Sequence, residues 1–346
     1  MSDPVRVAAA KRCVQAHYSR LADARAETVQ AALAAHMTPD ALWRGMHPFH
    51  EQRGPEAIAA TFWTPFLEAF SAPQRREDIF FAGQNSVGPG VWTASMGHLM
   101  GLFDAPFIGI PPTGRIAMLR YAEFNRVEDG RITETALFVD LLHLMAQANV
   151  YPLPPQTGAQ LVQPGPRTQD GLLRGPQDPA EGEKTLALIN AMIGAIDHAN
   201  AAKRPLPPAE ELAQHWHDDM CWWGPSGIGA TYTIARYIQQ HQRPFRHETK
   251  DREFYGHICR MAEGSYGGFF GWPNLSIVPV GDYLGLPATH TRAPMRVVDI
   301  YRRAGDKLSE NWVFIDILHF LAEQGLDILG RMDRLQRPIS SRVRMH

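Results

Sequence analysis

Apolar residues recur at helical spacing near the start of each half of the chain. Residues 5–36 are rich in alanine with this spacing, and the second half has one stripe at positions i, i+3, i+4 and i+7. The stripe consists of Leu188, Ile189, Met192, Ile193 and Ile196. Further along, short β-branched and aromatic runs alternate with turn residues, as in residues 118–141 around Asp129-Gly130. Helices followed by strands predict an α+β fold with an antiparallel sheet.

One pattern of strand, turn and strand occurs twice along the chain. Residues 123–143 and 299–319 align without a gap at an offset of 176 positions, and each segment ends in Asp-x-x-His. Upstream, Gly54-Pro55 matches Gly224-Pro225 at an offset of 170, which makes His47 equivalent to His217. A period of this length that occurs twice predicts two copies of one domain rather than a solenoid.

The segment between the two copies has the composition of a linker. Residues 152–179 are crowded with Pro, Gly, Gln and Asp and show no sustained periodicity. We therefore predict a first domain over residues 1–151, a linker over 152–180, a second domain over 181–332 and a basic tail over 333–346.

Composition and charge narrow the class of protein. The formal net charge of the 346 residues is −2, with no long basic stripe, so nucleic acid is not an expected partner. No apolar run approaches the roughly 18 residues that span a bilayer, so a membrane is not expected either. The first residues lack the apolar region of a secretory signal, which predicts a cytoplasmic location. The three widely spaced cysteines indicate reduced thiols.

Alternation along the last strand of each copy places acids and aromatic rings on one face. In the second copy this face holds Glu310, Trp312, Phe314 and Asp316. In the first copy it holds Glu134, Phe138 and Asp140. A carboxylate that faces a pocket between rings loses solvation, which raises its pKa toward values useful for acid/base catalysis. We therefore expect catalytic acids and substrate-binding rings on this face, chiefly in the second copy, because Ala136 replaces the tryptophan in the first.

A histidine follows each of the two strand-end aspartates by three residues. On the first turn of a helix, His143 and His319 would lie beside Asp140 and Asp316 and could orient them or share their protons. The alternative is that each aspartate caps the helix that follows it and that each histidine packs its ring on that helix.

Several further residues are candidates for contact with a substrate. Glu123 and Asp299 hold equivalent positions on the preceding strand, and Tyr301 shares a face with Asp299. Their alternative role is an exposed ion pair. The segments near His47 and His217 are rich in histidine, and Trp222 and Trp223 follow the second of them. We expect these residues at the lip of a pocket, with a His-x-His metal site or ordinary core packing as the alternatives.

The order of motifs in both copies resembles the SnoaL-like polyketide cyclases of the nuclear transport factor 2-like superfamily. The resemblance rests on residues 109–115 (Gly-Ile-Pro-Pro-Thr-Gly-Arg), on residues 129–134 (Asp-Gly-Arg-Ile-Thr-Glu) and on residues 310–316. It implies two tandem cone-shaped domains, each a curved sheet wrapped around helices, with a pocket at the open end. In these cyclases an aspartate near the end of this strand is the acid/base of an intramolecular aldol closure, which implies that role for Asp140 and Asp316. Residues 97–101 (Gly-His-Leu-Met-Gly) depart from the usual Gly-Thr-His-x-Gly.

These patterns lead to one expected function and one alternative. Neither a nucleotide-binding nor a flavin-binding motif is present, so no cofactor is expected. The chain is expected to be a cofactor-independent cyclase, isomerase or dehydratase/hydratase, a lyase or isomerase, for a hydrophobic cyclic or aromatic small molecule. The alternative is a non-catalytic module of the same fold that binds a small molecule or a protein.

The remaining face of the last strand predicts how the two copies meet. Val313, Ile315 and Ile317 form an apolar face that would be costly to expose to water. We expect the other copy to cover this face, which gives an intrachain pseudo-dimer. Further association into a homo-oligomer is left open.

Overall fold

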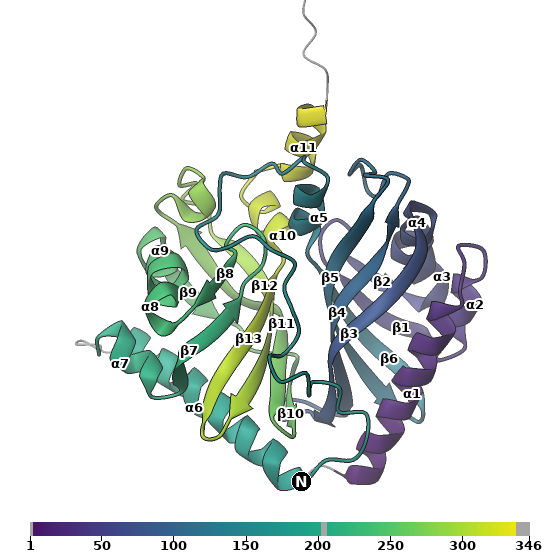
Figure 1. Ribbon diagram of the computed structural model, residues 1–346, viewed down its shortest axis with the longest axis horizontal. Coiled ribbons are helices and arrows are strands. Elements are labelled where there is room, and N and C mark those ends of the chain that lie inside the picture. The colour runs from purple at the N-terminus through teal and green to yellow at the C-terminus, as the bar shows by residue number, and fades with distance from the viewer. Residues whose placement is uncertain (1–2, 202–205, 337–346) are drawn as a thin grey trace, which may run out of the picture.

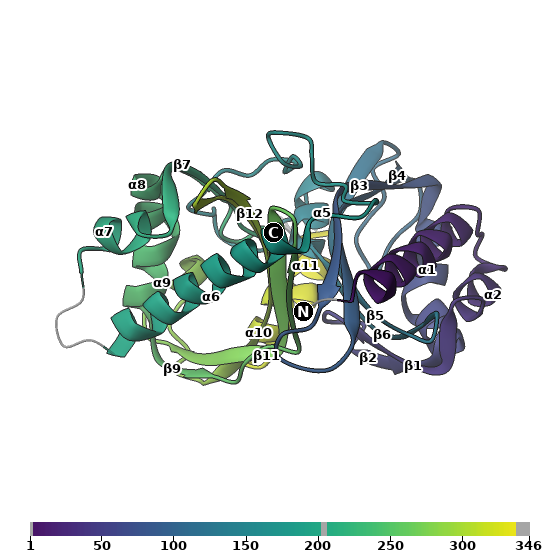
Figure 2. The same cartoon turned by 90° about the horizontal axis from the view of Figure 1, so that it is seen from below.

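In the computed structural model, which describes residues 3–201 and 206–336, two sheets lie face to face and helices cover their outer sides (Figure 1). Viewed from below, α1 and α2 lie at one end of the molecule and α7, α8 and α9 at the other, whereas α5, α10 and α11 lie near the middle (Figure 2). The α+β prediction is thereby confirmed, with one domain built around each sheet.

The first domain has a described six-stranded sheet in the order β2-β1-β6-β5-β4-β3. Its strands are β1 (Met37–Gly45), β2 (Glu51–Arg53), β3 (Phe70–Gln84), β4 (Val91–Phe103), β5 (Ile116–Glu128) and β6 (Arg131–Val139). Its helices are α1 (Pro4–Ala22), α2 (Val29–Ala34), α3 (Gly54–Ile58), the π-helical turn η1 (Ala59–Trp63), α4 (Thr64–Ala69) and α5 (Leu141–Gln147).

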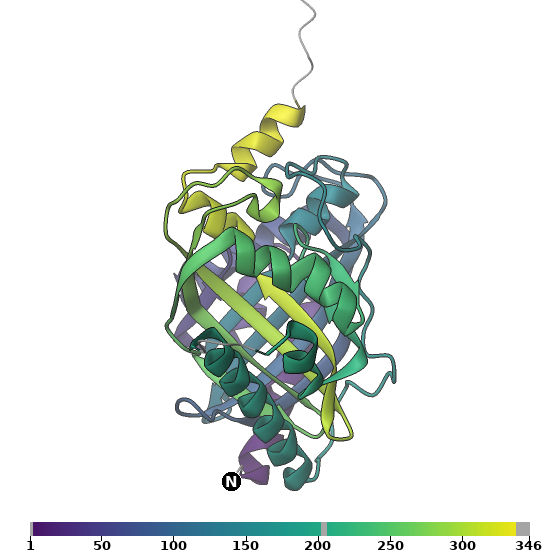
Figure 3. The same cartoon turned by 90° about the vertical axis from the view of Figure 1, so that its left-hand side faces the viewer.

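The second domain repeats this plan in the order β10-β11-β12-β13-β7-β8, and β9 also pairs with β11. Its strands are β7 (Trp216–Trp223), β8 (Ala230–Tyr232), β9 (Thr249–Phe254), β10 (Cys259–Glu263), β11 (Tyr266–Pro279), β12 (Ala293–Ala304) and β13 (Lys307–Ile315). Its helices are α6 (Pro179–Ala201), α7 (Pro208–Ala213), α8 (Ile234–Tyr237), η2 (Ile238–Gln242), α9 (Arg243–Glu248), η3 (Tyr283–Gly285), α10 (Ile317–Ala322) and α11 (Ile328–Gln336). Figure 3 shows teal and green helices lying across the outer face of this sheet.

Each sheet is mixed rather than purely antiparallel. Strand β1 pairs with β6 in parallel, and β7 pairs with β13 in the same way, whereas the other pairs are antiparallel. The helical segment after β1 carries the chain to the far edge of the sheet, so that the last strand returns beside the first one. The sequence analysis predicted an antiparallel sheet. Alternation along single strands does not reveal this crossover or the parallel pair that it creates.

The helix after β1 is interrupted at a proline in both domains. A π-helical turn, η1 or η2, precedes Thr64-Pro65 in the first domain and Arg243-Pro244 in the second. Proline has no backbone N–H, so the regular hydrogen-bond pattern cannot continue through it. The two π-helical turns lie 179 positions apart, which identifies equivalent residues in the two helical segments.

The strand pairing shows that the offset of 170 predicted for the front of the repeat is wrong. Trp43 pairs with Thr135, and Trp222 pairs with Asn311, so that the two tryptophans are equivalent at an offset of 179. His47 is therefore equivalent to Ser226 and not to His217. The matched Gly-Pro dipeptides have different roles, because Gly54 begins helix α3 whereas Gly224 follows strand β7.

An aromatic cluster joins the two sheets. The ring of Phe270 lies 5.1 Å from that of Phe124, 5.4 Å from that of Trp92 and 6.3 Å from that of Phe138, measured between centroids. We call the following buried residues the interface cluster: Met46, Ile79, Phe81, Trp92, Ala94, Met96, Ala122, Phe124, Ala136, Phe138, Cys259, Met261, Tyr266, Phe270, Val298, Ile300, Trp312 and Phe314. Both sheets contribute to it, so burial of this cluster couples the two domains.

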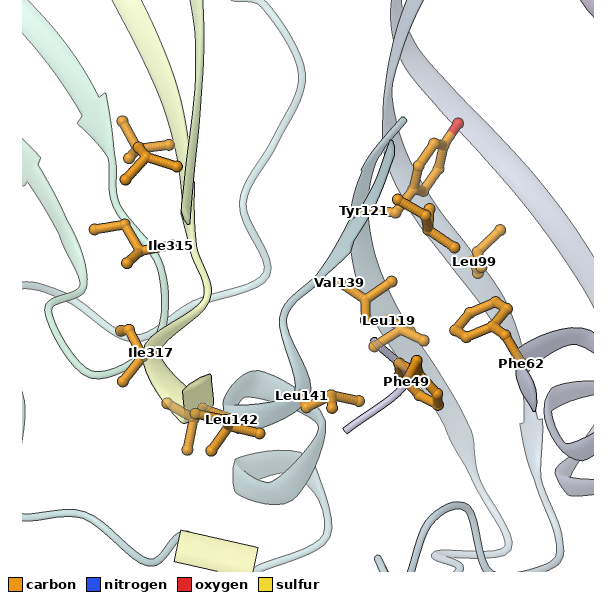
Figure 4. Close-up of a cluster of buried hydrophobic side chains, with 14 of the residues drawn as sticks. Phe49, Phe62, Leu99, Leu119, Tyr121, Val139, Leu141, Leu142, Ile315 and Ile317 are labelled. Carbon is orange, nitrogen blue, oxygen red and sulfur yellow. The ribbon is translucent and has the colours of Figure 1, made fainter. Parts of the chain in front are cut away.

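The sheets therefore meet through the opposite face from the one predicted. Trp312, Phe314 and Phe138 belong to the interface cluster, and of the three Phe314 also borders a small cavity of about 10 Å³ between the domains. Ile315 lies on the side of β13 that faces away from the first sheet, and Ile317 begins helix α10 (Figure 4). Both faces of the strand are apolar, so the alternation defined the two faces but could not decide which one meets the other copy.

Arg120 crosses the interface with its side chain almost wholly buried. Its guanidinium lies 4.0 Å from the ring centroid of Phe314 and donates to the carbonyl oxygens of Val313 (3.1 Å) and Trp223 (3.0 Å). Burial lowers the pKa of Arg120 to about 9. Backbone carbonyls and an aromatic face thus solvate this charge in place of water.

The segment between the domains, teal in Figure 1, crosses in front of both sheets. Leu172 forms a β-bridge with Phe80 of the first sheet, and Ala159 forms one with Ala230 of the second. The indole nitrogen of Trp312 donates to the carbonyl oxygen of Pro164 (3.1 Å). The predicted linker is thus held against both domains by backbone hydrogen bonds.

The helices and the C-terminal segment bear on the expectations about a membrane and a basic tail. None of the described helices is long and apolar enough to cross a bilayer. Of the predicted basic tail, residues 333–336 belong to helix α11, and residues 337–346 lie outside the described part of the chain.

We predict that Phe270→Ala lowers the free energy of unfolding by about 3–5 kcal/mol, because it leaves a cavity among three rings of the other sheet. Urea unfolding followed by tryptophan fluorescence measures the change. Tyr232→Ala, which removes a ring that is 57% exposed, serves as the control and should change stability by less than about 1 kcal/mol. Equal effects of the two substitutions would contradict a stabilising interface.

Candidate functional site

The two strand-end aspartates cap helices and also bridge the domains. Asp140 accepts from the backbone N–H of His143 (3.0 Å) through one oxygen and from that of Ser226, in the other domain, through the second (2.8 Å). Asp316 makes the equivalent pair of bonds, and here the helix bond is 3.2 Å long and the bond from the N–H of His47 is 3.0 Å long. This reciprocal arrangement is the helix-cap alternative, extended across the interface.

Burial shifts the pKa of Asp316 and of both histidines. The Asp316 side chain is 0% exposed, and burial raises its pKa to about 6. The hydrogen bond from the N–H of His47 and the charge of Arg296, 3.3 Å away, act in the opposite direction and lower the pKa. Burial also lowers the pKa of His143, and it lowers that of His319 to about 4. Both imidazoles are therefore neutral near pH 7.

Each histidine ring has a neighbour on its own helix. The His143 ring nitrogen Nδ1 lies 3.4 Å from the amide of Gln147, and that of His319 lies 3.9 Å from Glu323. The Asp-x-x-His pattern therefore reflects a backbone cap, and a catalytic role for these four residues stays an untested prediction.

The other acids of the last strands also have partners outside any pocket. Glu134 forms an ion pair with Arg44. Glu310 is buried and accepts from the backbone N–H of Arg167 (3.2 Å), and burial raises its pKa. These contacts attach the strands to their neighbours, and a catalytic role for Glu134 and Glu310 stays an untested prediction.

The predicted lip residues are not brought together. The His217 ring nitrogen Nε2 lies 2.8 Å from the carbonyl oxygen of Ala304, whereas the His47 ring packs on that of His50, 5.2 Å between centroids. Trp223 packs against the interface cluster. Only Trp222 of this group lies on the helix-covered face of its sheet. Among the described residues, no group of three or more His, Cys, Asp or Glu side chains is placed to hold a metal ion.

The helix-covered face of the first sheet contains an internal ion pair. Arg75 donates to Glu123 (3.0 Å), and its guanidinium lies 3.8 Å from the ring centroid of Tyr18 and 4.6 Å from that of Tyr121. Burial opposes ionisation of Glu123, but Arg75 and the amide of Asn125 outweigh it and hold the pKa of Glu123 below its usual value. We call this group the first interior.

The first interior is filled by its own side chains. The free volume next to Glu123, Trp43 and Trp63 is about 10 Å³, room for about one water molecule. Ile58 and Phe62 above the sheet are 0% exposed, and Phe66 is 1% exposed. A ligand larger than water therefore cannot enter this side of the first domain without displacing core residues.

The equivalent face of the second sheet carries a carboxyl group without an ionic partner among the described residues. Asp299 takes the place of Glu123, accepts from the amide of Asn311 (3.2 Å) and lies beside the hydroxyl group of Tyr301. Burial raises the pKa of Asp299 to about 6. We call Asp299, Tyr301, Asn311, Tyr237, His241, Phe245, Trp216, Trp222 and Phe269 the second interior.

Solvent reaches the second interior. At the offset of 179, Tyr237, His241 and Phe245 are equivalent to Ile58, Phe62 and Phe66 of the first domain. The three residues of the second domain are half-buried, whereas their equivalents in the first domain are fully buried. Asp299 is half-buried too, although it lies on the sheet under the helices. Polar and aromatic side chains thus replace apolar ones here and are more exposed than their counterparts in the first domain.

The hydroxyl groups near Asp299 remain protonated at neutral pH. Burial and the charge of Asp299 raise the pKa of Tyr237 and that of Tyr301 above their usual values. Burial lowers the pKa of His241 to about 3, and its neutral ring stacks on Trp222 with centroids 4.1 Å apart. The second interior thus combines one titratable carboxyl group with two hydrogen-bond donors, the combination that acid/base chemistry at a carbonyl compound requires.

Sequence reasoning found part of this group and missed the rest. It proposed Asp299, Tyr301 and Trp222 as pocket residues but not Tyr237, His241 or Asn311. The helix residues were missed because the front of the repeat was aligned at the wrong offset. Aligned at 179, two polar rings would have stood out against apolar core residues of the first copy.

Comparison with known proteins shows what the first domain is similar to. Residues 15–148 match the model of the SnoaL-like polyketide cyclases. A candidate SnoaL-like polyketide cyclase from Jannaschia sp. CCS1 is 20% identical, with 43% of this chain and 96% of that chain covered and a TM-score of 0.34. IdmH, a candidate polyketide cyclase from Streptomyces antibioticus, is 21% identical, with coverages of 40% and 96% and a TM-score of 0.33.

A third similar structure carries only a superfamily description. It is an NTF2-like protein from Burkholderia thailandensis E264, 22% identical, with 42% of this chain and 98% of that chain covered and a TM-score of 0.31. A search of curated proteins gives no match.

We predict that Asp316→Ala lowers the free energy of unfolding by about 2–4 kcal/mol, because two buried N–H groups lose their acceptor. Asp316→Asn retains an accepting oxygen and should lose only about 1 kcal/mol. Chemical denaturation of both variants measures the difference. Unchanged stability of both, with enzymatic activity lost in both, would show instead that Asp316 acts in catalysis.

Proposed function

Because residues 15–148 form a SnoaL-like polyketide cyclase domain and the second half repeats its architecture, we propose that this protein is a cofactor-independent acid/base enzyme whose reaction takes place in the second interior. The family indicates activity of the cyclase or isomerase kind. The proposed substrate is a hydrophobic cyclic or aromatic small molecule, and Asp299 is the proposed base. A lyase or isomerase reaction of this kind needs only proton transfers.

The proposal rests on the difference between Glu123 and Asp299, which occupy equivalent positions in the two domains. Two equivalent carboxyl groups lie under the helices, and they differ in their ionic partners and in their pKa. Glu123 is neutralised by Arg75 and sealed beneath apolar side chains, whereas Asp299 has a raised pKa and is reached by solvent. A carboxylate with a pKa near 6 is ionised at neutral pH and is a stronger base than an ordinary aspartate.

The proposed chemistry begins with removal of a proton from a carbon next to a carbonyl group. The C–H bond breaks, the proton moves to the carboxylate of Asp299, and the electron pair forms an enolate. The phenol groups of Tyr237 and Tyr301 are protonated and can donate hydrogen bonds to the enolate oxygen. The enolate carbon then attacks a second carbonyl group of the same molecule, whose oxygen takes the proton from the Asp299 carboxyl group, or the enolate takes that proton back at another carbon.

The surrounding rings would serve to position a flat substrate. Trp222 and His241 already stack on each other, and Phe269 stacks on His257 with centroids 3.9 Å apart. Apolar ring surfaces exclude water and favour one orientation of a cyclic compound.

We predict that kcat/KM rises with pH and levels off above about pH 7. Asp299 must be ionised to accept a proton, and its pKa is raised to about 6, so activity is lost as the pH falls through about 6. A pH–rate profile measures the inflection. An inflection near pH 4, typical of an ordinary exposed aspartate, would contradict the assignment of Asp299 as the base.

We predict that Asp299→Asn lowers turnover about 10²–10⁴-fold, because the amide cannot accept a proton. Wild-type and variant protein are incubated with a metabolite extract, and mass spectrometry detects a compound that isomerises or loses water. Asp219→Asn is the matched control, since this aspartate of the same domain is 55% exposed. It should retain full activity.

Two other outcomes of this experiment decide against the proposal. Loss of activity in Asp140→Asn or Asp316→Asn, with Asp299→Asn fully active and all proteins folded, would assign the chemistry to the strand-end acids. No conversion by any folded form would favour the alternative of a non-catalytic binding module, which the accessible aromatic lining of the second interior equally fits.

A further inference from the structure

A cavity of about 210 Å³ lies where the two domains meet the segment that joins them. Its walls are the first half of α1, the end of β3, the end of β10, residues 174–178 and the first two turns of α6. The beginnings of α1 and α6 lie at the lower edge of the molecule in Figure 1. An engineered cavity of about 150 Å³ accommodates benzene, so this one has room for a compound of about a dozen non-hydrogen atoms.

A buried ion pair fixes the walls of this cavity. The Lys11 side chain, 3% exposed, pairs with Glu263 of β10 and donates to the carbonyl oxygens of Leu173 (2.6 Å) and Gly175 (2.8 Å). Glu263 also accepts from the backbone N–H of Ala82 at the end of β3 (2.8 Å). Helix α1, both sheets and the joining segment are thus connected at one point, so the cavity is formed before any ligand binds.

Most of the charged side chains around the cavity already have partners. Three are basic and three are acidic, so the lining carries no net charge: Lys11, Arg12, Arg174, Asp178, Glu183 and Glu263. Arg174 forms an ion pair with Glu77 (3.0 Å), and Asp178 accepts from the N–H of Ala180 in the first turn of α6 (3.0 Å). With the pair of Lys11 and Glu263, four of the six charges are accounted for.

One cation and one anion remain. The side chains of Arg12 on α1 and Glu183 on α6 form no hydrogen bond or ion pair within residues 3–201 and 206–336, with each other or with a third group. The amide of Gln84 is likewise unpaired in this part of the chain, and strand alternation places it on the same face of β3 as Ala82, which also lines the cavity. The remaining lining is largely apolar and includes Pro4, Val7, Ala8, Pro176, Pro179 and Leu186.

We propose that this cavity binds a small zwitterion, a compound that carries the ammonium and carboxylate groups of an amino acid on an apolar or aromatic body. The carboxylate pairs with Arg12 and the ammonium group with Glu183, while the body packs on the apolar walls. A ligand with a single charge would satisfy one of these side chains and leave the other unpaired. A lining without net charge likewise favours a ligand without net charge.

This site is separate from the proposed reaction. None of the residues around the cavity belongs to the second interior. Both domains and the joining segment form its walls, and ligand sites occur preferentially at such domain boundaries. Because a ligand here would contact both domains, its binding should also raise the temperature at which the protein unfolds.

Ligand-observed NMR titration of the whole protein with three probes tests the inference. Phenylalanine, 3-phenylpropionate and phenethylamine share a ring and a two-carbon chain and differ in which charged groups they carry. Phenylalanine should bind at least about fivefold more tightly than either of the other two, because it alone can pair with both free side chains, each of which is exposed.

Two single substitutions assign the charges. Arg12→Gln should reduce the affinity for phenylalanine to that for phenethylamine and leave phenethylamine binding unchanged. Glu183→Gln should reduce the affinity for phenylalanine to that for 3-phenylpropionate and leave the binding of that anion unchanged. Both residues are exposed, so neither substitution should affect folding.

A third substitution locates the binding site. Ala8→Phe adds a ring to a half-buried position of α1 that lines the cavity, and it should remove binding of all three probes. Ala187→Phe is the matched control, since this alanine is exposed on α6 outside the lining, and this variant should bind like the wild type.

Several results would overturn the zwitterion site, and none of them bears on the role of Asp299. They are the absence of phenylalanine binding, equal or tighter binding of either singly charged probe, and binding that persists in folded Ala8→Phe. Equal weakening of all three probes by Arg12→Gln or Glu183→Gln would also overturn it. Should Ala8→Phe fail to fold, the probe series and the two charge variants decide the question alone.

Discussion

The ring of Phe270 lies against Trp92, Phe124 and Phe138 of the other sheet, and the rest of the molecule is arranged around this contact. Each domain buries one face of its sheet against the other domain and the opposite face beneath its helices. The first of these faces is closely packed around the interface cluster, so that the interface determines how the domains associate.

The same interface explains the two strand-end aspartates. Asp140 and Asp316 end the last strands beside the other domain, where each accepts one N–H from its own helix and one from its neighbour. Buried N–H groups need acceptors, and a carboxylate can serve two at once. The recurrence of Asp-x-x-His in both copies follows from this shared structural requirement, independently of any role in a reaction.

The two domains have diverged where the helices cover the sheets. The first domain pairs Arg75 with Glu123 and covers them with the buried ring of Phe62, whereas in the second domain the half-buried ring of His241 replaces Phe62. The side chains over the second sheet are thus more polar and more exposed than those over the first.

Sequence alone determined the α+β class, the duplication and the resemblance to SnoaL-like cyclases, because turn motifs and strand alternation are local properties. It also identified Asp299, Tyr301 and Trp222. It could not tell which face of β13 meets the other copy, since Trp312 and Ile315 are equally apolar. Nor could it show that Arg75 neutralises Glu123 across two strands. Those outcomes depend on register and burial, which only the tertiary structure decides.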